Sequence, residues 1–317
     1  MPAQRAKVVI ATRRSRLALW QAEHVKERLQ ALRRGLEVEL LPLSTRGDEL
    51  VDVSLAKVGG KGLFVKELEN ALAEGLADIA VHSMKDVPAQ LPDGFTLGAI
   101  LARDDPRDAF VSARFENLAS LPAGSAVGTS SLRRQAQIAA RHRGLEIRSL
   151  RGNVETRVAK LDRGEYAAIV LAAAGLKRLG LEARIRSYLS IEESVPAAGQ
   201  AALGVECLAT RDDLLQLLAP LEDRASSACV RAERAVNRAL GGSCTIPLGA
   251  FAEVRGVIAG AHGARLHLRA IVASPDGTQV VRAEGEGEAA APEALGLRVA
   301  ELLRARGATE ILAVLAP

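Results

Sequence analysis

Aromatic side chains are scarce in this sequence, which has one Trp, two Tyr and five Phe among 317 residues. Proteins that bind single-stranded nucleic acid usually stack bases on aromatic rings, so the scarcity argues against that class. The sequence has no apolar run of 18 residues, and its N-terminal segment has neither a long apolar core nor a cleavage site. We therefore expect no transmembrane helix and no signal peptide.

Cysteine is also rare, and the three residues lie far apart in the sequence. None has the CxxC spacing, so we expect neither a zinc site nor a disulfide framework, and a reducing cytoplasm fits best. Cys229 lies on the apolar face of a predicted helix and Cys207 ends an apolar run, so both are expected in the core. Cys244 follows two glycines and a serine, which predicts a loop. A thiol there is either incidental, or a nucleophile or attachment point.

Lysine is scarce as well, because the chain has 34 Arg but only eight Lys, and none follows Lys177. A guanidinium can bind a carboxylate or phosphate through two parallel hydrogen bonds, so arginine suits anion recognition. A genome rich in G and C also raises the arginine content, so the position of the charges is more informative than their number. The net charge of +4 hides two opposite segments. Residues 128–160 carry eight basic and two acidic side chains, whereas residues 192–223 carry one basic and seven acidic.

The remaining composition, 48% hydrophobic and 25% charged, is ordinary for a globular protein, and the length predicts two or three domains. Strand and helix patterns alternate in two successive units, which is typical of parallel, doubly wound sheets. In the first helix, Trp20 and Leu32 belong to an approximate apolar stripe. The first unit is expected to have strands at 7–12, 38–43 and 78–82 and helices at 17–33 and 64–76. The second is expected to have helices at 132–141 and 154–163 and strands at 146–150 and 167–173.

A small apolar segment after Pro196 predicts a return crossing into the first unit. Two crossings between two lobes would form a hinge over a cleft, where ligands usually bind. From about residue 222 the pattern changes to a small α+β domain with an antiparallel sheet, with strands at 248–254, 265–273 and 279–286 and a helix at 293–306. The expected boundaries are 1–101 plus 199–219 for domain 1, 102–198 for domain 2 and 220–317 for domain 3.

Two predicted strand-to-helix junctions are suited to anions. Residues 128–131 (GTSS) are followed at once by Arg133 and Arg134, and residues 151–153 (RGN) repeat the arrangement. Free N–H groups, hydroxyls and the helix dipole favour an anion at such a junction. The pair predicts a ligand with several negative charges, although a basic run can also be only a solvated surface. Nucleic acid is the obvious polyanion, but the few aromatics and small net charge argue against it.

Asp86 follows a predicted buried strand, at the position where doubly wound folds place their sites. It can be a loop residue paired with Lys85, or a carboxylate that acts as acid and base beside cationic groups. Residues 59–62 (GGKG) lack the complete phosphate-loop pattern. We therefore expect Lys61 to be a cation on a loop at the cleft rim. No metal site is apparent in the sequence.

Taken in order, the motifs resemble the porphobilinogen deaminase (hydroxymethylbilane synthase) family over nearly the whole chain. Any one of them is weak alone, whereas so many in one order are highly specific. The matching stretches are ATRxS at 11–15, LALWQ at 17–21, TRGD at 45–48, GGKGLF at 59–64, HSMKDVP at 82–88, RxDPRDA at 103–109, GTSSLRR at 128–134, RGNxxTR at 151–157 and GGxC ending at Cys244.

The resemblance implies an α/β fold with two doubly wound lobes, like those of periplasmic binding proteins, and a small C-terminal α+β domain that carries the cofactor. It implies a transferase of tetrapyrrole (heme) biosynthesis that joins four porphobilinogen molecules head to tail, releases ammonia and, after hydrolysis, yields 1-hydroxymethylbilane. The implied cofactor is dipyrromethane, a primer of two porphobilinogen units held by a thioether to Cys244. We expect a cytoplasmic monomer whose partner is porphobilinogen, without nucleic acid or membrane.

By motif position, the resemblance implies that Asp86 is the catalytic carboxylate. Each porphobilinogen carries an acetate and a propionate, so every unit added to the chain brings two carboxylates to the arginine clusters. The implied cofactor-binding residues are Lys85, Asp86, Thr129, Ser131, Arg133, Arg134, Arg151 and Gly152. The implied substrate-binding residues are Arg13, Ser15, Phe64, Arg157, Arg178 and Gln200.

Two positions depart from the family pattern. Arg16 stands where many relatives carry Pro or another residue, and Ala201 stands where Gly is common, which would stiffen the second crossing. The rival functions are a two-lobed carrier of an anionic ligand and a nucleic-acid-binding protein. The carrier would share both lobes, but Asp86 beside Lys85, Cys244 on its glycine loop and the third domain argue against it. Nucleic-acid binding would depend strongly on salt.

Overall fold

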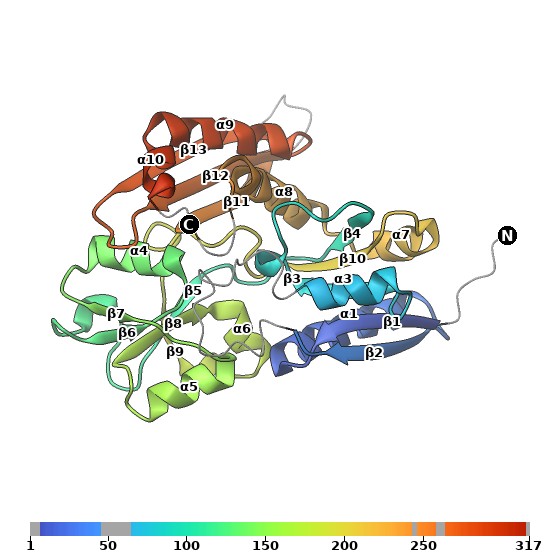
Figure 1. The fold of residues 1–317 in the computed structure, drawn as a ribbon, viewed down its shortest axis with the longest axis horizontal. Coiled ribbons are helices and arrows are strands. Elements are labelled where there is room, and N and C mark those ends of the chain that lie inside the picture. Colours follow the sequence, from blue (N-terminus) through green and yellow to red (C-terminus); the bar gives the residue numbers. More distant parts are fainter. Residues whose placement is uncertain (1–6, 46–64, 243–245, 258–263, 315–317) are drawn as a thin grey trace.

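The structure is a computed structural model that describes residues 7–45, 65–242, 246–257 and 264–314. Its strands form two five-stranded sheets and one three-stranded sheet. Figure 1 shows them as separate groups, with the first sheet at the right, the second at the lower left and the third at the top. We call the parts built on them the first lobe, the second lobe and the C-terminal unit.

The first lobe is doubly wound, as predicted. Its strand order is β2-β1-β3-β10-β4, in which β1 is parallel to β2 and β3, whereas β10 runs antiparallel to β3 and β4. Alternate residues of β1 point to opposite faces, so Ile10 packs under α1 and α7 while Ala11 packs under α3. The elements are β1 (Lys7–Arg13), α1 (Arg16–Leu32), β2 (Glu37–Leu43), α3 (Lys66–Ala73), β3 (Ile79–Ser83), the 3₁₀ turn η1 (Met84–Asp86), β4 (Phe95–Ile100), β10 (Leu203–Leu208) and α7 (Asp212–Leu218).

The second lobe has the corresponding strand order, β7-β6-β8-β5-β9. β6 is parallel to β7 and β8, and β5 is antiparallel to its two neighbours. Ile138 of α4 packs on one face of the sheet, and Val158 and Leu176 of α5 and α6 pack on the other. The elements are β5 (Asp108–Val111), β6 (Ala126–Gly128), α4 (Leu132–Arg141), β7 (Glu146–Arg148), α5 (Val154–Asp162), β8 (Ala168–Ala172), α6 (Ala173–Arg178) and β9 (Ile185–Tyr188).

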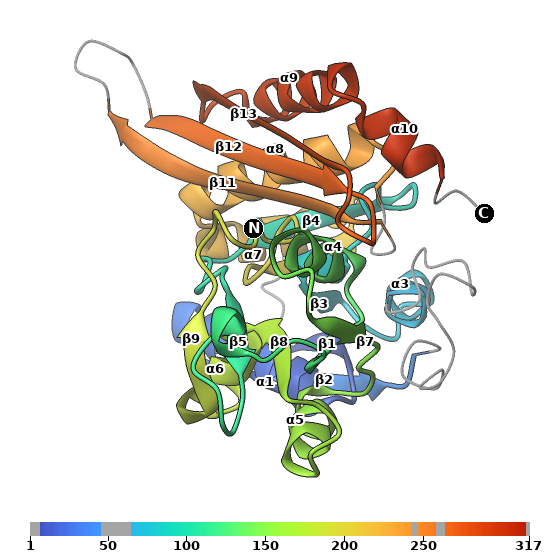
Figure 2. The same ribbon diagram turned by 90° about the vertical axis from the view of Figure 1, so that its left-hand side faces the viewer.

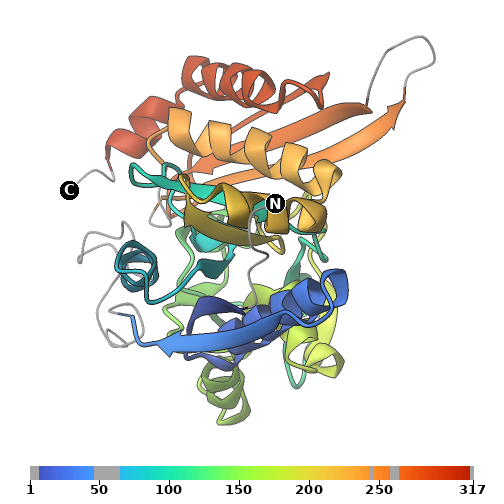
Figure 3. The ribbon, with the colours of Figure 1, turned by 90° about the vertical axis from the view of Figure 1, so that its right-hand side faces the viewer.

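The C-terminal unit is an antiparallel sheet covered on one face by two long helices. Figures 2 and 3 show α8 and α9 along this sheet, and Val236 and Val299 are among their buried contacts with it. The other face meets the second lobe, because Phe251 and Ile271 pack on Val195. The elements are α8 (Arg224–Ala239), β11 (Leu248–Val257), β12 (Ala264–Ala273), β13 (Val280–Glu288), α9 (Pro292–Ala305) and α10 (Ala308–Ala313).

The chain passes between the lobes twice, and the predicted return crossing is confirmed by β10, which lies between β3 and β4. The first crossing runs from β4 to β5 and the second from β9 to β10. Ala201 in the second crossing has φ +72°, the left-handed conformation that costs a non-glycine residue about 1–2 kcal/mol. It is the one non-glycine residue with positive φ in the described part of the chain.

Several local predictions need correction. Trp20 and Leu32, placed on an apolar stripe, are 39% and 49% exposed. The ring of Trp20 stacks on His24 and lies under the guanidinium of Arg178 from the second lobe. The strand expected at 146–150 ends at Arg148, because the backbone N–H of Leu150 donates to the Ser130 hydroxyl instead of a neighbouring strand. The pattern did not predict β4, β5, β9, α6, α7 or α10.

Candidate active site

The segment that carries Asp86 lies at the carboxyl edge of the first sheet. Because β1 and β3 are parallel and Ala11 is paired with Ala80, their ends meet there, which brings Arg13 to the same edge as Asp86. The segment also packs on the second crossing. A Cβ added to Gly199, whose φ is +73°, would lie 2.7 Å from the Cβ of Met84, so only glycine allows this approach. The Met84 N–H donates to the carbonyl of Ala202 at 3.0 Å.

The two anion-binding corners predicted in the second lobe lie side by side. The N–H of Thr129 donates to the Arg148 carbonyl at 3.0 Å, and the Ser130 hydroxyl donates to the Leu150 carbonyl at 2.6 Å. Gly152 in the second corner has φ +108°, and an added Cβ would collide with Thr156. Both corners open onto the N-termini of helices, α4 and α5.

Hydroxyls cap the helices at these junctions. The Ser131 oxygen accepts a hydrogen bond from the N–H of Arg134, and the Thr129 oxygen accepts one from the N–H of Ser131. Ser15 caps α1 in the first lobe by accepting from the N–H of Ala18. In each case the hydroxyl oxygen accepts from the backbone, so its hydrogen can be donated to a ligand.

A buried carboxylate of the second lobe, Asp108, binds several of the predicted site residues. Asp108 has no exposed surface, and its oxygens accept hydrogen bonds from the side chains of Arg133, Arg134, Ser194 and Gln200 at 2.7–3.2 Å. Burial alone would raise the pKa of Asp108, but the two guanidinium groups hold it far below its usual range. The cluster of Asp108, Arg133 and Arg134 therefore keeps one net positive charge.

Charged groups of the two lobes influence one another's pKa values. Burial lowers the pKa of Lys85 to about 8, the charge of Asp86 opposes that shift, and Arg134 adds to it. The pKa of Arg157 is lowered to about 10, first by burial and then by Arg134 and Arg151, whereas the charge of Asp86 opposes the shift. Asp86 is thus within electrostatic reach of Arg157, and several cations lie close enough to lower one another's pKa values. Crowded, partly desolvated cations are costly unless an anion binds among them.

Lys85→Met is expected to stabilise the chain without bound ligands. The pKa of Lys85 is about 8 in the folded chain, against an ordinary value of 10.5. Below pH 8 the buried charge therefore lowers the free energy of unfolding, and this destabilisation disappears as the pH rises from 8 to 10.5. The difference between the two pKa values corresponds to about 3 kcal/mol. Urea unfolding at pH 7 should therefore show a free energy of unfolding for Lys85→Met that is higher than that of the parent by up to this amount, and the increase should shrink towards pH 10.5. Lys26→Met, on α1, is the control, and a Lys85→Met variant less stable than its parent at pH 7 would contradict the expectation.

Three of the predicted ligand-binding residues, Arg133, Gln200 and Arg178, make hydrogen bonds within the protein. Both terminal nitrogens of Arg133 bond to Asp108, and one also reaches Ser194 and the carbonyl of Val195. Gln200 is buried and donates to the carbonyl of Pro106. The Nε of Arg133 has no hydrogen-bond partner among the described residues, and the ligand contacts expected of Arg133 and Gln200 stay predictions.

Arg178 is the third of these residues. It donates to the Ala201 carbonyl at 2.6 Å and pairs with Asp104 at 3.7 Å, so it joins the two crossings. Its guanidinium also lies over the ring of Trp20. Through these contacts, the side chain of Arg178 connects α1, α6 and both crossings. Burial lowers the pKa of its guanidinium.

Some predictions concern residues outside the described part of the chain: Lys61, Phe64, Cys244 and most of the motifs at 45–48 and 59–64. The expected core positions of Cys207 and Cys229 are confirmed, since both are buried and burial raises their pKa values to about 11 and 12. Among the described residues, no group of three or more His, Cys, Asp or Glu side chains is placed to hold a metal ion. No helix in these ranges is long and apolar enough to cross a membrane.

The sequence did not assign roles to two buried acids that shape the site. Asp108 begins β5, where an acid precedes an apolar run, and Glu233 lies on α8 with no exposed surface. Glu233 falls among Cys229, Ala232 and Val236, on the apolar face of that helix. A charged residue on such a face is itself a sign of a buried ion pair.

Family comparisons cover nearly the whole chain. Residues 8–216 match the family described as porphobilinogen deaminase, dipyromethane cofactor binding domain, and residues 227–305 match porphobilinogen deaminase, C-terminal domain. A porphobilinogen deaminase of Paraburkholderia phymatum is 57% identical over 317 residues, covering 99% of this chain and 95% of the relative. A porphobilinogen deaminase of Methylobacillus flagellatus is 58% identical over 308 residues, covering 97% of each chain.

Two solved structures with a weaker likeness are described as binding proteins. A putative methionine-binding lipoprotein of Bacillus subtilis is 13% identical, with a TM-score of 0.44, and covers 68% of this chain and 90% of its own. The periplasmic aliphatic sulphonate binding protein of Escherichia coli is 11% identical, with a TM-score of 0.40, and the match covers 74% of this chain and 70% of that one.

Proposed function

We propose that this chain, which belongs to the porphobilinogen deaminase family, performs its chemistry in the cleft between the two lobes, with Asp86 as the catalytic carboxylate. The enzyme is a transferase that polymerises porphobilinogen in tetrapyrrole biosynthesis, and its cofactor is dipyrromethane. The observation that carries the assignment of Asp86 is its position just after β3, within electrostatic reach of Lys85 and Arg157. The product of four condensations and a hydrolysis would be 1-hydroxymethylbilane.

The charge of the cleft fits a cofactor rich in carboxylates. Arg134 and Arg151 both lower the pKa of Arg157, so these cations repel one another until an anion neutralises them. We propose that Lys85, Arg151 and Arg157 bind carboxylates of cofactor and growing chain. Thr129, Ser131 and the backbone at Gly152 would add hydrogen bonds, and Arg13, Ser15 and Phe64 would contact the incoming substrate.

We also propose that Arg133 and Arg134 bind carboxylates of the cofactor, and that Gln200 and Arg178 contact the substrate. Arg133, Arg134 and Gln200 all bond to Asp108, which would fix the wall of the cleft and its positive field. Arg178 would in addition hold the second crossing, where it bonds to Ala201. Lys61 keeps its proposed place as a cation at the cleft rim.

Asp86 would assist both halves of each condensation. Loss of ammonia from porphobilinogen leaves a positive charge shared with the pyrrole nitrogen, and a carboxylate beside that N–H stabilises the charge as it develops. When bound, the cofactor supplies the pyrrole α-carbon to which the first substrate unit is added. After the new carbon–carbon bond forms, Asp86 can accept the proton that the α-carbon loses, which restores the aromatic ring.

We propose that the cofactor is attached through a thioether to Cys244. Purified protein should have an intact mass that exceeds the sequence mass by a two-pyrrole adduct, and Cys244→Ser should lack the adduct. Cys207→Ala is the matched control, because that thiol is fully buried and its pKa is raised to about 11, which makes it unreactive. An unmodified wild-type mass from cells that make porphobilinogen normally would contradict the attachment.

We further propose a cytoplasmic monomer with domain limits of 1–101 plus 199–219, 102–198 and 220–317. The separate hydrophobic clusters of the two lobes and of the C-terminal unit support the division. Both described cysteines are free thiols, in keeping with a reducing compartment. Light scattering during size-exclusion chromatography tests the oligomeric state, and a dimer mass would refute it.

A further inference from the structure

We propose that Arg234, on α8 of the C-terminal unit, is a positioning residue that fixes the segment carrying Asp86. The inference rests on the proposed catalytic role of Asp86. The guanidinium of Arg234 donates to three consecutive carbonyls just after Asp86: Val87 at 3.2 Å, Pro88 at 2.7 Å and Ala89 at 3.4 Å. One side chain from another unit thus binds the backbone within three residues of the catalytic carboxylate.

The environment of Arg234 is unusual for an arginine. Its side chain is buried, and within the described ranges no carboxylate forms an ion pair with it. Its pKa is lowered to about 10, first by burial and then by the charge of Arg238, while the charge of Glu206 opposes the shift. A desolvated guanidinium without an anionic partner is costly, and its hydrogen bonds to the three carbonyls are the compensation the structure gives it. Lysine could not satisfy them in the same way, because it has no planar fork.

The neighbouring residue, Glu233, holds both crossings. Its oxygens accept two hydrogen bonds from the Arg103 side chain at 2.8 and 2.9 Å, and one from the N–H of Gly199 at 2.7 Å. Gly199 in turn lies against Met84. The segment with Asp86 is therefore held on one side by the second crossing and on the other by Arg234, and both supports come from one turn of α8.

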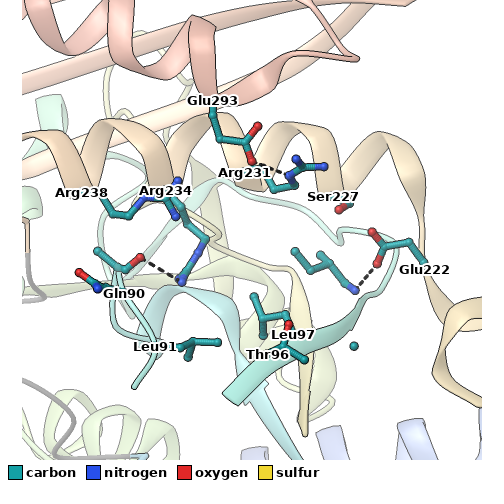
Figure 4. A pocket seen from close by; sticks show the side chains of 13 residues that line it. Gln90, Leu91, Thr96, Leu97, Glu222, Ser227, Arg231, Arg234, Arg238 and Glu293 are labelled. Carbon is teal, nitrogen blue, oxygen red and sulfur yellow. Dashed lines mark hydrogen bonds and ion pairs between the residues drawn. The ribbon is translucent and has the colours of Figure 1, made fainter. Parts of the chain in front are cut away.

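A cavity beside Arg234 allows this role to be separated from a purely structural one. It has a volume of about 460 Å³ and lies between α8 and the first lobe, lined by residues that include Gln90, Leu97, Arg231 and Arg234 (Figure 4). Truncation of Arg234 would join its vacated space to this cavity. A small guanidinium compound could then reach the three carbonyls from solution.

The test compares Arg234→Ala with Arg231→Ala, which removes an exposed arginine of the same cavity that pairs with Glu293. Arg234→Ala should lower kcat by about tenfold or more, since small misplacements of catalytic groups have effects of that size, while KM changes little. Methylguanidine should restore part of kcat in Arg234→Ala and leave wild type and Arg231→Ala unchanged. The adduct mass should be unaltered in both variants.

A wild-type kcat in Arg234→Ala, or a lowered kcat that methylguanidine does not raise, would overturn the proposal. If Arg234→Ala does not fold, Arg234→Lys decides: a lowered kcat at unchanged melting temperature supports positioning, and wild-type kinetics refute it. Asp86→Asn is measured alongside. Loss of activity in Asp86→Asn with a normal Arg234→Ala would sink only the positioning role, whereas an active Asp86→Asn would sink the proposed function itself.

Discussion

Asp86→Asn is expected to lower kcat by about 10²–10⁴-fold, the range typical for removal of a group that transfers protons in catalysis. Asparagine keeps the shape of the side chain but cannot carry the negative charge that stabilises the cationic pyrrole, and it cannot accept the proton. Asp86 is only part-buried in the described structure, so the fold should survive. Single-turnover measurement of ammonia release, together with the rate of product formation, checks both halves of the reaction.

The control is Asp93→Asn, an exposed acid of the same lobe that follows the same segment. It should have wild-type kinetics and an unchanged melting temperature. Asp86→Glu should retain more activity than Asp86→Asn, because it restores the charge at a shifted position. Near-normal turnover in Asp86→Asn would mean that another group performs the proton transfer.

Asp108→Asn should reduce the free energy of unfolding by about 3–5 kcal/mol, the usual cost of removing one partner from a buried ion pair. Two buried guanidinium groups, those of Arg133 and Arg134, would lose their shared carboxylate at once. The pKa of Asp108 lies far below its usual range when folded, so its stabilisation is fully present above about pH 4 and is lost as the pH falls towards the folded-state pKa. Urea unfolding at pH 7 and at pH 3 measures both effects.

A surface pair provides the comparison for Asp108. Glu146 bonds to Arg148 with both side chains half exposed, so Glu146→Gln should leave the free energy of unfolding nearly unchanged. Asp108→Asn should also impair activity, because Arg134 contributes to the field at Lys85 and Arg157. A change in unfolding free energy below about 1 kcal/mol would show that the two arginines find other partners.

The sequence predicted the repeated strand–helix alternation because each buried strand and amphipathic helix has a local pattern. The bounds of α4 matched, and those of α5 differed by one residue. Strand β5 was not predicted. Its four residues, beginning with Asp108, are all buried, so the sequence there does not alternate between polar and apolar side chains. Trp20 was misplaced because a helical stripe does not distinguish a face that meets a sheet from one that meets another lobe.

The corners at 128–131 and 151–153 could be predicted, because helix N-termini, hydroxyls and arginines lie within a few residues there. The partners of Arg133 could not, because Asp108 and Ser194 lie 25 and 61 residues away in the sequence. Arg234 was missed for the same reason, with its carbonyl partners about 146 residues distant. Such pairings depend on the tertiary fold, and no local pattern contains them.

The place of β10 between β3 and β4 in the first sheet has a consequence for synthesis. Strands β3 and β4 are complete by Ile100, but the strand between them begins only at Leu203. At about 5–20 residues per second, the ribosome needs roughly 5–20 s to make the intervening hundred residues. During that interval β3 and β4 lack their common neighbour, and the last strand of the second lobe, which ends at Tyr188, is made before β10 begins. The second lobe can therefore fold first, although the first lobe begins the chain.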